Sequence, residues 1–164
     1  MKELLLQYAQ YNVWANKLII DVLLKLEEGA ADKEIISSFP SVFKTVMHTW
    51  SAESIWLQRL LLAERPVWQE DVFAGNIEAA CSEWQKTSAE LVKFVEKQYD
   101  DKALQHVLQF YDRQKNSYKM PVYQVLHHVF NHSTYHRGQL ITMLRQLGLT
   151  KLPQTDFTAF VRQK

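Results

Sequence analysis

The chain has 164 residues, of which 47% are hydrophobic and 12% aromatic, so we expect it to fold around a hydrophobic core as one domain spanning residues 1–164. Its 19 Lys and Arg residues against 18 Asp and Glu give a net charge of +1, which argues against nucleic acid or an anionic membrane as a partner. The single cysteine, Cys81, excludes an internal disulfide and a cysteine-rich zinc site.

The N-terminal stretch "MKELLLQYAQYNVWANKL" reads as an amphipathic helix and not as a signal peptide, because it contains Glu3 and has no small-residue cleavage site. No apolar run along the chain approaches the ~20 residues that a membrane-spanning helix needs. With four Gly and four Pro there is also little room for a turn-rich all-β fold. We therefore expect a cytoplasmic, all-α protein.

Four long segments have the spacing of apolar side chains that is typical of helices, at about residues 2–27, 42–63, 77–98 and 121–148. Ser41 is placed to cap the second segment, Pro121 is a favoured first-turn residue of the fourth, and Gly148 is a favoured C-cap. Between the third and fourth segments, "HVLQFYDRQKNSYKM" has aromatic and β-branched residues on both sides of "DRQKN", which favours a short hairpin.

The connections between these segments indicate how the helices are arranged. Residues 64–75 form the longest stretch without a regular pattern, and Asp156 is placed to cap a last short helix, "FTAFVRQ". Four long helices with two long connections predict a four-helix bundle with crossover connections, and not a simple up-and-down bundle.

The fourth helix carries an unusual concentration of histidines, in "VLHHVFNHSTYHRGQL". At about 100° per residue, His132 and His136 lie toward its apolar face, whereas His128 flanks that face and His127 lies on the polar side. Two imidazoles one turn apart on one face can share a metal ion. The spacing alone is a weak signal, because a buried histidine satisfied by hydrogen bonds is the alternative interpretation.

A third ligand has to come from another part of the chain. His48, in "TVMHTWSAESIWLQR", is the best placed, but its helix is apolar on two sides and the helical phase leaves its direction open. His106 lies in the irregular segment and is a poorer candidate.

Other polar residues on the helices are given structural roles. We expect Asn12 and Asn16 to form hydrogen bonds between helices, with support of a ligating histidine as the alternative. Arg137 is expected in a surface or interhelix salt bridge. For Glu53, pairing with Arg59 is favoured over a place at the metal.

Three further residues bear on packing and association. Cys81 is interpreted as a small buried residue and not as a nucleophile. Gly138 costs a helix roughly 1 kcal/mol relative to Ala, and is expected to permit the close approach of another helix. Trp14 is the candidate exposed apolar residue of a homodimer interface.

Three stretches carry a family resemblance: "YNVWANKLI", "VMHTWSAESIWLQRL", and "LHHVFNHSTYHRGQLITMLRQLG" followed by "PQTDF". They resemble, in the same order, the motifs of the DinB/YfiT family of bacterial metal-binding four-helix bundles. Together they cover most of the chain, whereas residues 64–118 match only in outline.

The resemblance implies an all-α bundle with unusual connectivity, frequent dimers, and a divalent metal, zinc or nickel, held by His48, His132 and His136. Relatives include thiol S-transferases that use low-molecular-weight thiols and a mycothiol-dependent isomerase, although many members have no known activity. The implied function is a metal-dependent transferase or hydrolase, acting on a low-molecular-weight thiol and an electrophilic small molecule. The alternative is a non-catalytic metal-binding or stress-response protein. No catalytic residue beyond the metal ligands is identified.

Overall fold

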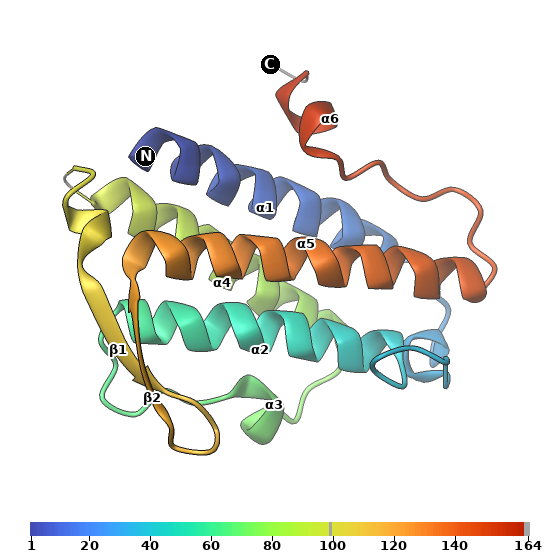
Figure 1. The fold of residues 1–164 in the computed structure, drawn as a ribbon. Helices are drawn as coiled ribbons and strands as arrows, with labels where there is room; N and C mark the ends of the chain where they lie inside the picture. Colours follow the sequence, from blue (N-terminus) through green and yellow to red (C-terminus); the bar gives the residue numbers. More distant parts are fainter. Residues whose placement is uncertain (99, 163–164) are drawn as a thin grey trace.

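The computed structural model describes residues 1–98 and 100–162, and the long helices within them are α1 (Lys2–Leu23), α2 (Val42–Leu60), α4 (Ile77–Lys97) and α5 (Val122–Gln146). In Figure 1, α1 and α5 run in one direction and α2 and α4 in the other. Both α1 and α2 pack against α4 and α5, so α1 and α2 lie on one diagonal of the bundle and α4 and α5 on the other. The predicted all-α bundle with crossover connections is confirmed.

The order of the helices explains why the connections are long. The chain crosses the first diagonal between α1 and α2 through the 3₁₀ turn η1 (Ala30–Asp32). Because α2 and α4 are parallel neighbours, the chain must then return along the whole bundle (Figure 1). This return contains α3 (Gln69–Val72), a helical turn that the sequence analysis had assigned to irregular structure.

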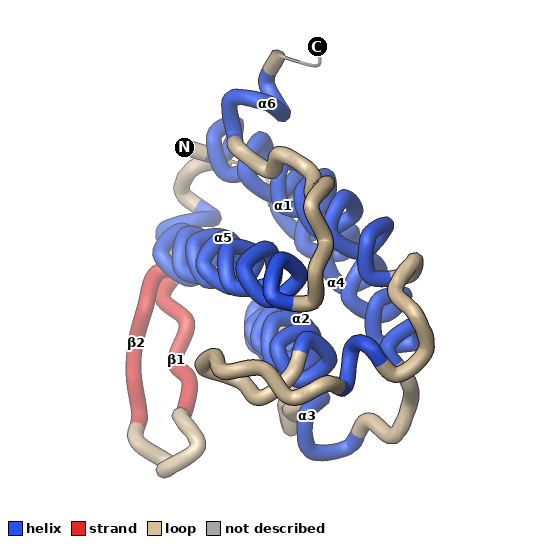
Figure 2. Tube along the Cα trace, turned by 90° about the vertical axis from the view of Figure 1, so that its right-hand side faces the viewer, coloured by secondary structure: helices blue, strands red, loops and turns tan. Residues whose placement is uncertain are grey.

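The second diagonal, from α4 to α5, is crossed through the 3₁₀ turn η2 (Ala103–Gln105) and an antiparallel pair of strands, β1 (Val107–Tyr111) and β2 (Ser117–Pro121). Val107 pairs with Pro121 at the base of the hairpin, and Tyr111 pairs with Ser117 next to the turn. The predicted hairpin is confirmed, and Figure 2 shows it beside the bundle at the start of α5.

Two helix ends follow the signals in the sequence, and two depart from them. The Ser41 side chain accepts a hydrogen bond from the backbone N–H of Lys44 at 3.2 Å, which confirms the predicted cap of α2. Gly148 has a φ of 93°, the left-handed conformation that favours glycine after a helix. Pro121 is the last residue of β2 and not the first of α5. Helix α1 ends at Leu23, four residues before the predicted position 27.

The C-terminal segment folds back over α1 as α6 (Phe157–Val161), on the outer side of the bundle (Figure 2). Asp156 makes no side-chain capping bond there, contrary to expectation, and Gln163, the last residue of the predicted helix, lies outside the described residues. The ring of Phe160 lies 5.6 Å from that of Trp14. Trp14 is thus half-buried by its own chain, contrary to the exposed position expected for it, and the homodimer stays a prediction.

The interior consists of two apolar clusters, and each of the four long helices contributes to both. Between them lies a layer of buried polar side chains, formed by Asn12, Asn16, Glu53, Ser88, Ser133 and Arg137. This arrangement places a polar layer near the middle of every long helix. Among the described helices, none is long and apolar enough to cross a membrane.

Candidate metal centre

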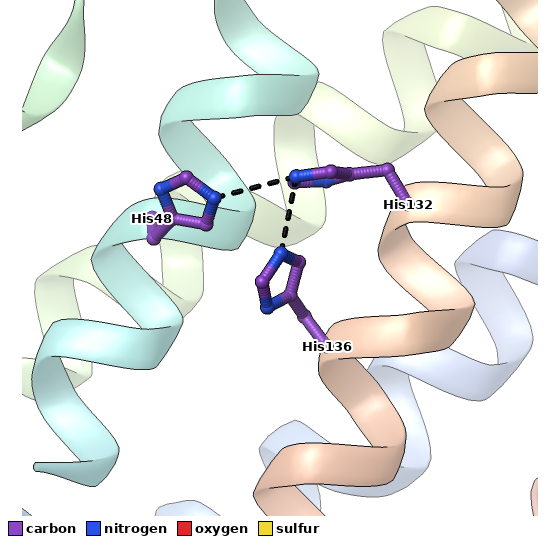
Figure 3. A group of neighbouring side chains, drawn as sticks. All are labelled: His48, His132 and His136. Atoms are coloured by element: carbon purple, nitrogen blue, oxygen red, sulfur yellow. Dashed lines mark hydrogen bonds between the residues drawn. The ribbon is translucent and has the colours of Figure 1, made fainter. Parts of the chain in front are cut away.

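Three histidines from two antiparallel helices meet at one point, as Figure 3 shows. The Nε2 atom of His132 lies 3.3 Å from Nε2 of His48 and 3.1 Å from Nε2 of His136. One ligand atom from each ring lies within 4.8 Å of the others. The structure therefore brings together the three side chains that the sequence analysis named, with His48 on α2 facing the pair on α5.

The remaining histidines considered from the sequence lie outside this group. His127 and His106 are exposed. The ring of His128 lies 5.7 Å from that of His132 and meets the edge of Trp56, but it is not among the three that converge. The positions of His127 and His128 agree with the helical phase of α5.

Two of the three rings are held by hydrogen bonds on the side away from the centre. Nδ1 of His48 lies 2.8 Å from Oε1 of Glu70, and Nδ1 of His136 lies 2.7 Å from Oε1 of Gln139. The hydrogen bond with His48 holds the pKa of the Glu70 carboxyl below its ordinary value, so this group is an ionised acceptor and the His48 Nδ1 carries the proton. The Gln139 amide nitrogen donates to Ser38, which turns its oxygen toward His136.

The hydrogen bonds of the two Nδ1 atoms determine whether the Nε2 atoms at the centre act as donors or acceptors. In the tautomer that carries its proton on Nδ1, the rings of His48 and His136 both present an Nε2 lone pair to Nε2 of His132. Nε2 of His132 can donate one proton to only one of them, so at least one of the two lone pairs is left without a donor. A cation at the centre removes this conflict. Metal–nitrogen bonds of about 2.0–2.1 Å place two ligating nitrogens about 2.9–3.4 Å apart, which matches the observed distances.

The electrostatics of the group also suit a metal. Burial, together with the charges of neighbouring histidines, lowers the pKa of His132 to about 3. Burial likewise lowers the pKa of His136. Both rings are therefore neutral near pH 7, which is the form that binds a metal ion.

An aromatic side chain and a small cavity adjoin the group. The ring of Phe39 stacks on His48 with 4.4 Å between ring centroids and lies 5.8 Å from the ring of His136. Phe39 and Glu70 also form part of the wall of a cavity of about 250 Å³. The other wall residues are Pro40, Phe43, Lys44, Met47, Phe73 and Gly75.

Three residues that contact the histidines were not identified from the sequence. Gln139 could have been found, because it follows His136 by three residues and so lies on the same face of α5. No sequence pattern pointed to Glu70 or Phe39, because both lie in connections without helical periodicity. They contact His48 only because the folded chain brings these connections beside α2.

Beside this group, on the neighbouring face of α5, the buried polar layer corrects two expectations. The Glu53 carboxylate does not pair with Arg59. Instead it accepts hydrogen bonds from four side chains at 2.6 to 2.9 Å, those of Asn12, Asn16, Ser88 and Ser133.

Arg137, expected in a salt bridge, is buried in this same layer and donates to Oδ1 of Asn12 at 2.5 Å and of Asn16 at 2.7 Å. It has no carboxylate within 4.0 Å among the described residues. The expected hydrogen bonds of Asn12 and Asn16 between helices are confirmed.

Two smaller expectations have opposite outcomes. Cys81 is fully buried, and burial raises the pKa of its thiol to about 12, so it is not a nucleophile. Gly138 does not permit close helix packing, because a Cβ at this exposed position would meet nothing within 4 Å.

Comparison with known proteins agrees with this fold. The chain is 30% identical to Protein DinB of Bacillus subtilis (strain 168) over 170 residues, covering 98% of this chain and 95% of that protein. A DinB-like protein from Bacillus cereus has a similar fold, with a TM-score of 0.72 at 22% identity over 92% of this chain and 94% of the other. A DinB-like protein from Bacillus subtilis has a TM-score of 0.68 at 14% identity, over 92% and 97% of the two chains. The sequence profile of the DinB family matches residues 1–164, and the chain therefore belongs to the DinB family.

Proposed function

We propose that this protein binds one divalent metal ion through Nε2 of His48, His132 and His136, and that the ion serves catalysis. One observation carries the proposal: three Nε2 atoms face one another, with neighbouring pairs at 3.1 and 3.3 Å, while the Nδ1 atoms of two rings are already bonded outward. Imidazole suits several transition metals, and zinc or nickel is the ion we expect.

The size of the group favours catalysis over a purely structural role. Within the described part of the chain, the group contains three residues and no fourth histidine, cysteine or carboxylate. Structural zinc sites usually have four protein ligands, whereas catalytic sites have three and leave one position for water or substrate. A bound divalent ion with such an opening supplies Lewis acidity that lowers the pKa of a water molecule or a thiol.

The chain's own residues would prepare this site. Glu70 and Gln139 fix the orientation of two rings, and Phe39 covers one side of the His48 ring. The reaction that we propose is the transfer of a low-molecular-weight thiol to an electrophilic small molecule, with hydrolysis as the second candidate chemistry. The competing function is a metal-binding protein without catalysis.

Metal binding is tested directly on the purified protein by elemental analysis and by titration of the chelator-treated protein with Zn²⁺. We expect one equivalent per chain. A protein that takes up no Zn²⁺, Ni²⁺ or Co²⁺ would overturn the proposal.

The open position is tested on the Co²⁺-loaded protein, without knowledge of the substrate. Addition of 2-mercaptoethanol should produce a sulfur-to-cobalt charge-transfer band if a thiol can reach the ion. A closed site would give no new band, no turnover with any thiol or hydrolysable ester, and a sharply lower melting temperature in chelator. That set of results would favour the non-catalytic function.

A further inference from the structure

The β-hairpin reaches the candidate metal centre through Arg113, which lies in its turn. Nη2 of Arg113 is 3.2 Å from Oε2 of Glu70, and Nη1 is 3.1 Å from Oδ2 of Asp71. Its guanidinium also lies over the ring of Trp68, 4.3 Å from the centroid. The other carboxylate oxygen of Glu70 holds Nδ1 of His48, so a single residue, Glu70, connects the hairpin to the histidine group.

Apart from these contacts, few interactions hold the helical turn that carries Glu70 in place. Helix α3 is four residues long, buries none of its residues, and has no side-chain cap. Two hydrogen bonds tie it to α2: from the backbone N–H of Glu70 to Ser51 at 3.3 Å, and from the Gln69 side chain to Ser54 at 3.2 Å. Neither bond holds the Glu70 carboxylate itself, whose orientation therefore depends on His48 and Arg113.

The hairpin, in contrast, is firmly supported by α2. Nη2 of Arg59 donates to the carbonyl oxygen of Tyr111 at 2.7 Å. The Arg59 guanidinium lies over the rings of Trp56 and Phe110, at 4.6 and 5.1 Å from their centroids. These two rings also meet edge to face at 4.7 Å. The hairpin is thus a fixed base from which Arg113 extends to α3.

We infer that Arg113 is a positioning residue of the metal centre, which holds the Glu70 carboxylate so that Glu70 directs Nε2 of His48 at the ion. The inference rests on the proposed metal binding. A planar guanidinium can bind two carboxylate groups in fixed directions, and here it also offsets the repulsion between the adjacent acids Glu70 and Asp71. The hairpin therefore belongs to the metal centre, although none of its residues is a ligand.

The direction in which metal affinity changes when Arg113 is replaced distinguishes a positioning role from a simple effect of its charge. As a bare positive charge, Arg113 would oppose the binding of a cation, so its removal would leave the metal affinity unchanged or raise it. As a residue that orients Glu70, its removal should lower the affinity. Arg65 is a matched control, because it is exposed, lies in the connection that carries α3, and makes no ion pair among the described residues.

The experiment is a measurement of Zn²⁺ affinity by competition with a chromophoric chelator, for the wild type, Arg113→Gln, Arg113→Lys, Arg65→Gln, Glu70→Ala and the double variant Glu70→Ala/Arg113→Gln. We expect Glu70→Ala to weaken binding by about 10–100-fold, as is usual for a residue that orients a metal ligand, and Arg113→Gln by about tenfold. Arg113→Lys should also weaken binding, because lysine keeps the charge but loses the planar fork.

The double variant tests whether Arg113 acts through Glu70. We expect Arg113→Gln to have no further effect once Glu70 is replaced. Additive losses, or an Arg113→Gln protein that binds Zn²⁺ as tightly as Arg65→Gln, would overturn the inference and leave the metal site standing. A wild type that binds no Zn²⁺ would instead overturn the proposed function. Circular dichroism melting identifies any variant that has lost its fold, and Arg113→Lys then decides the question.

Discussion

Helix α5 contributes to two neighbouring polar clusters that differ in how their hydrogen bonds are satisfied. In the first, Ser133 and Arg137 join the buried layer, where the Glu53 carboxylate accepts four hydrogen bonds and only Nε of Arg137 is buried without a partner among the described members of the layer. In the second, His132 and His136 meet His48, and their Nε2 atoms face one another. Hydrogen bonds made within the fold contribute to folding, whereas acceptor nitrogens gathered around one point are suited to binding a cation.

The two asparagines explain how the buried layer carries opposite charges without a direct salt bridge. The amide nitrogens of Asn12 and Asn16 donate to Glu53, and their oxygens accept from Arg137. Each amide is therefore used at both ends and lies between a carboxylate and a guanidinium. Because the layer draws on all four long helices, removal of one member leaves partners on several helices unpaired.

The largest effect should come from the buried layer. Glu53→Ala should lower the free energy of unfolding by about 3–5 kcal/mol, because Arg137 and the donors that faced the carboxylate stay buried without it. Urea denaturation measures this change. The control is Glu90→Ala, which removes an exposed carboxylate of α4 and should change stability little. Equal unfolding midpoints for the two variants would refute the structural role of the layer.

For the histidine group we expect the opposite result, a large loss of metal affinity with little loss of stability. His136→Ala should lower Zn²⁺ affinity by more than the ~100-fold seen when a supporting residue is lost, and abolish any thiol transfer, because a ligand itself is removed. Helical circular dichroism and cooperative melting should persist, since two apolar clusters support the fold. His127→Ala, on the exposed side, should leave metal content unchanged. Loss of the fold in His136→Ala, measured without metal, would contradict this contrast.

The acid sensitivity of the metal-free protein gives a third test. Burial lowers the pKa of His132 to about 3, whereas an unfolded chain has a histidine pKa near 6.5. Between these values the unfolded chain binds the additional proton, so the contribution of a neutral His132 is fully present above pH ~6.5 and is lost as the pH falls toward 3. Urea denaturation of the chelator-treated protein at several pH values should show this decline in the free energy of unfolding. The free energy should fall less steeply with decreasing pH in His132→Asn. Equal pH dependence of the two proteins would show that His132 does not cause the decline.

The smallest effect concerns Gly138, which lies on the exposed face of α5 and takes part in neither cluster. Gly138→Ala should raise the free energy of unfolding by up to about 1 kcal/mol, because alanine favours an exposed helix interior and the added Cβ meets no atom within 4 Å. Zn²⁺ affinity should stay the same. A destabilised variant would mean that another chain or segment packs against this position.

Local sequence patterns predicted the features that depend on neighbouring residues. The helical periodicity, the Ser41 cap, the hairpin around "DRQKN" and the inward phase of His132 and His136 all follow from residues within one or two turns of each other. Such patterns repeat with the helix, so they are visible without knowledge of the fold.

Only the tertiary structure could decide the rest, because it depends on residues that meet across helices. The second helix is apolar on two sides, so its phase did not direct His48, whereas packing against α5 does. Pairing of Glu53 with Arg59 was the expectation, but the partners of Glu53 come from α1, α4 and α5. Glu70 lies in a four-residue helix, too short for periodicity to be read, and it reaches His48 only because the long return from α2 to α4 passes beside the site.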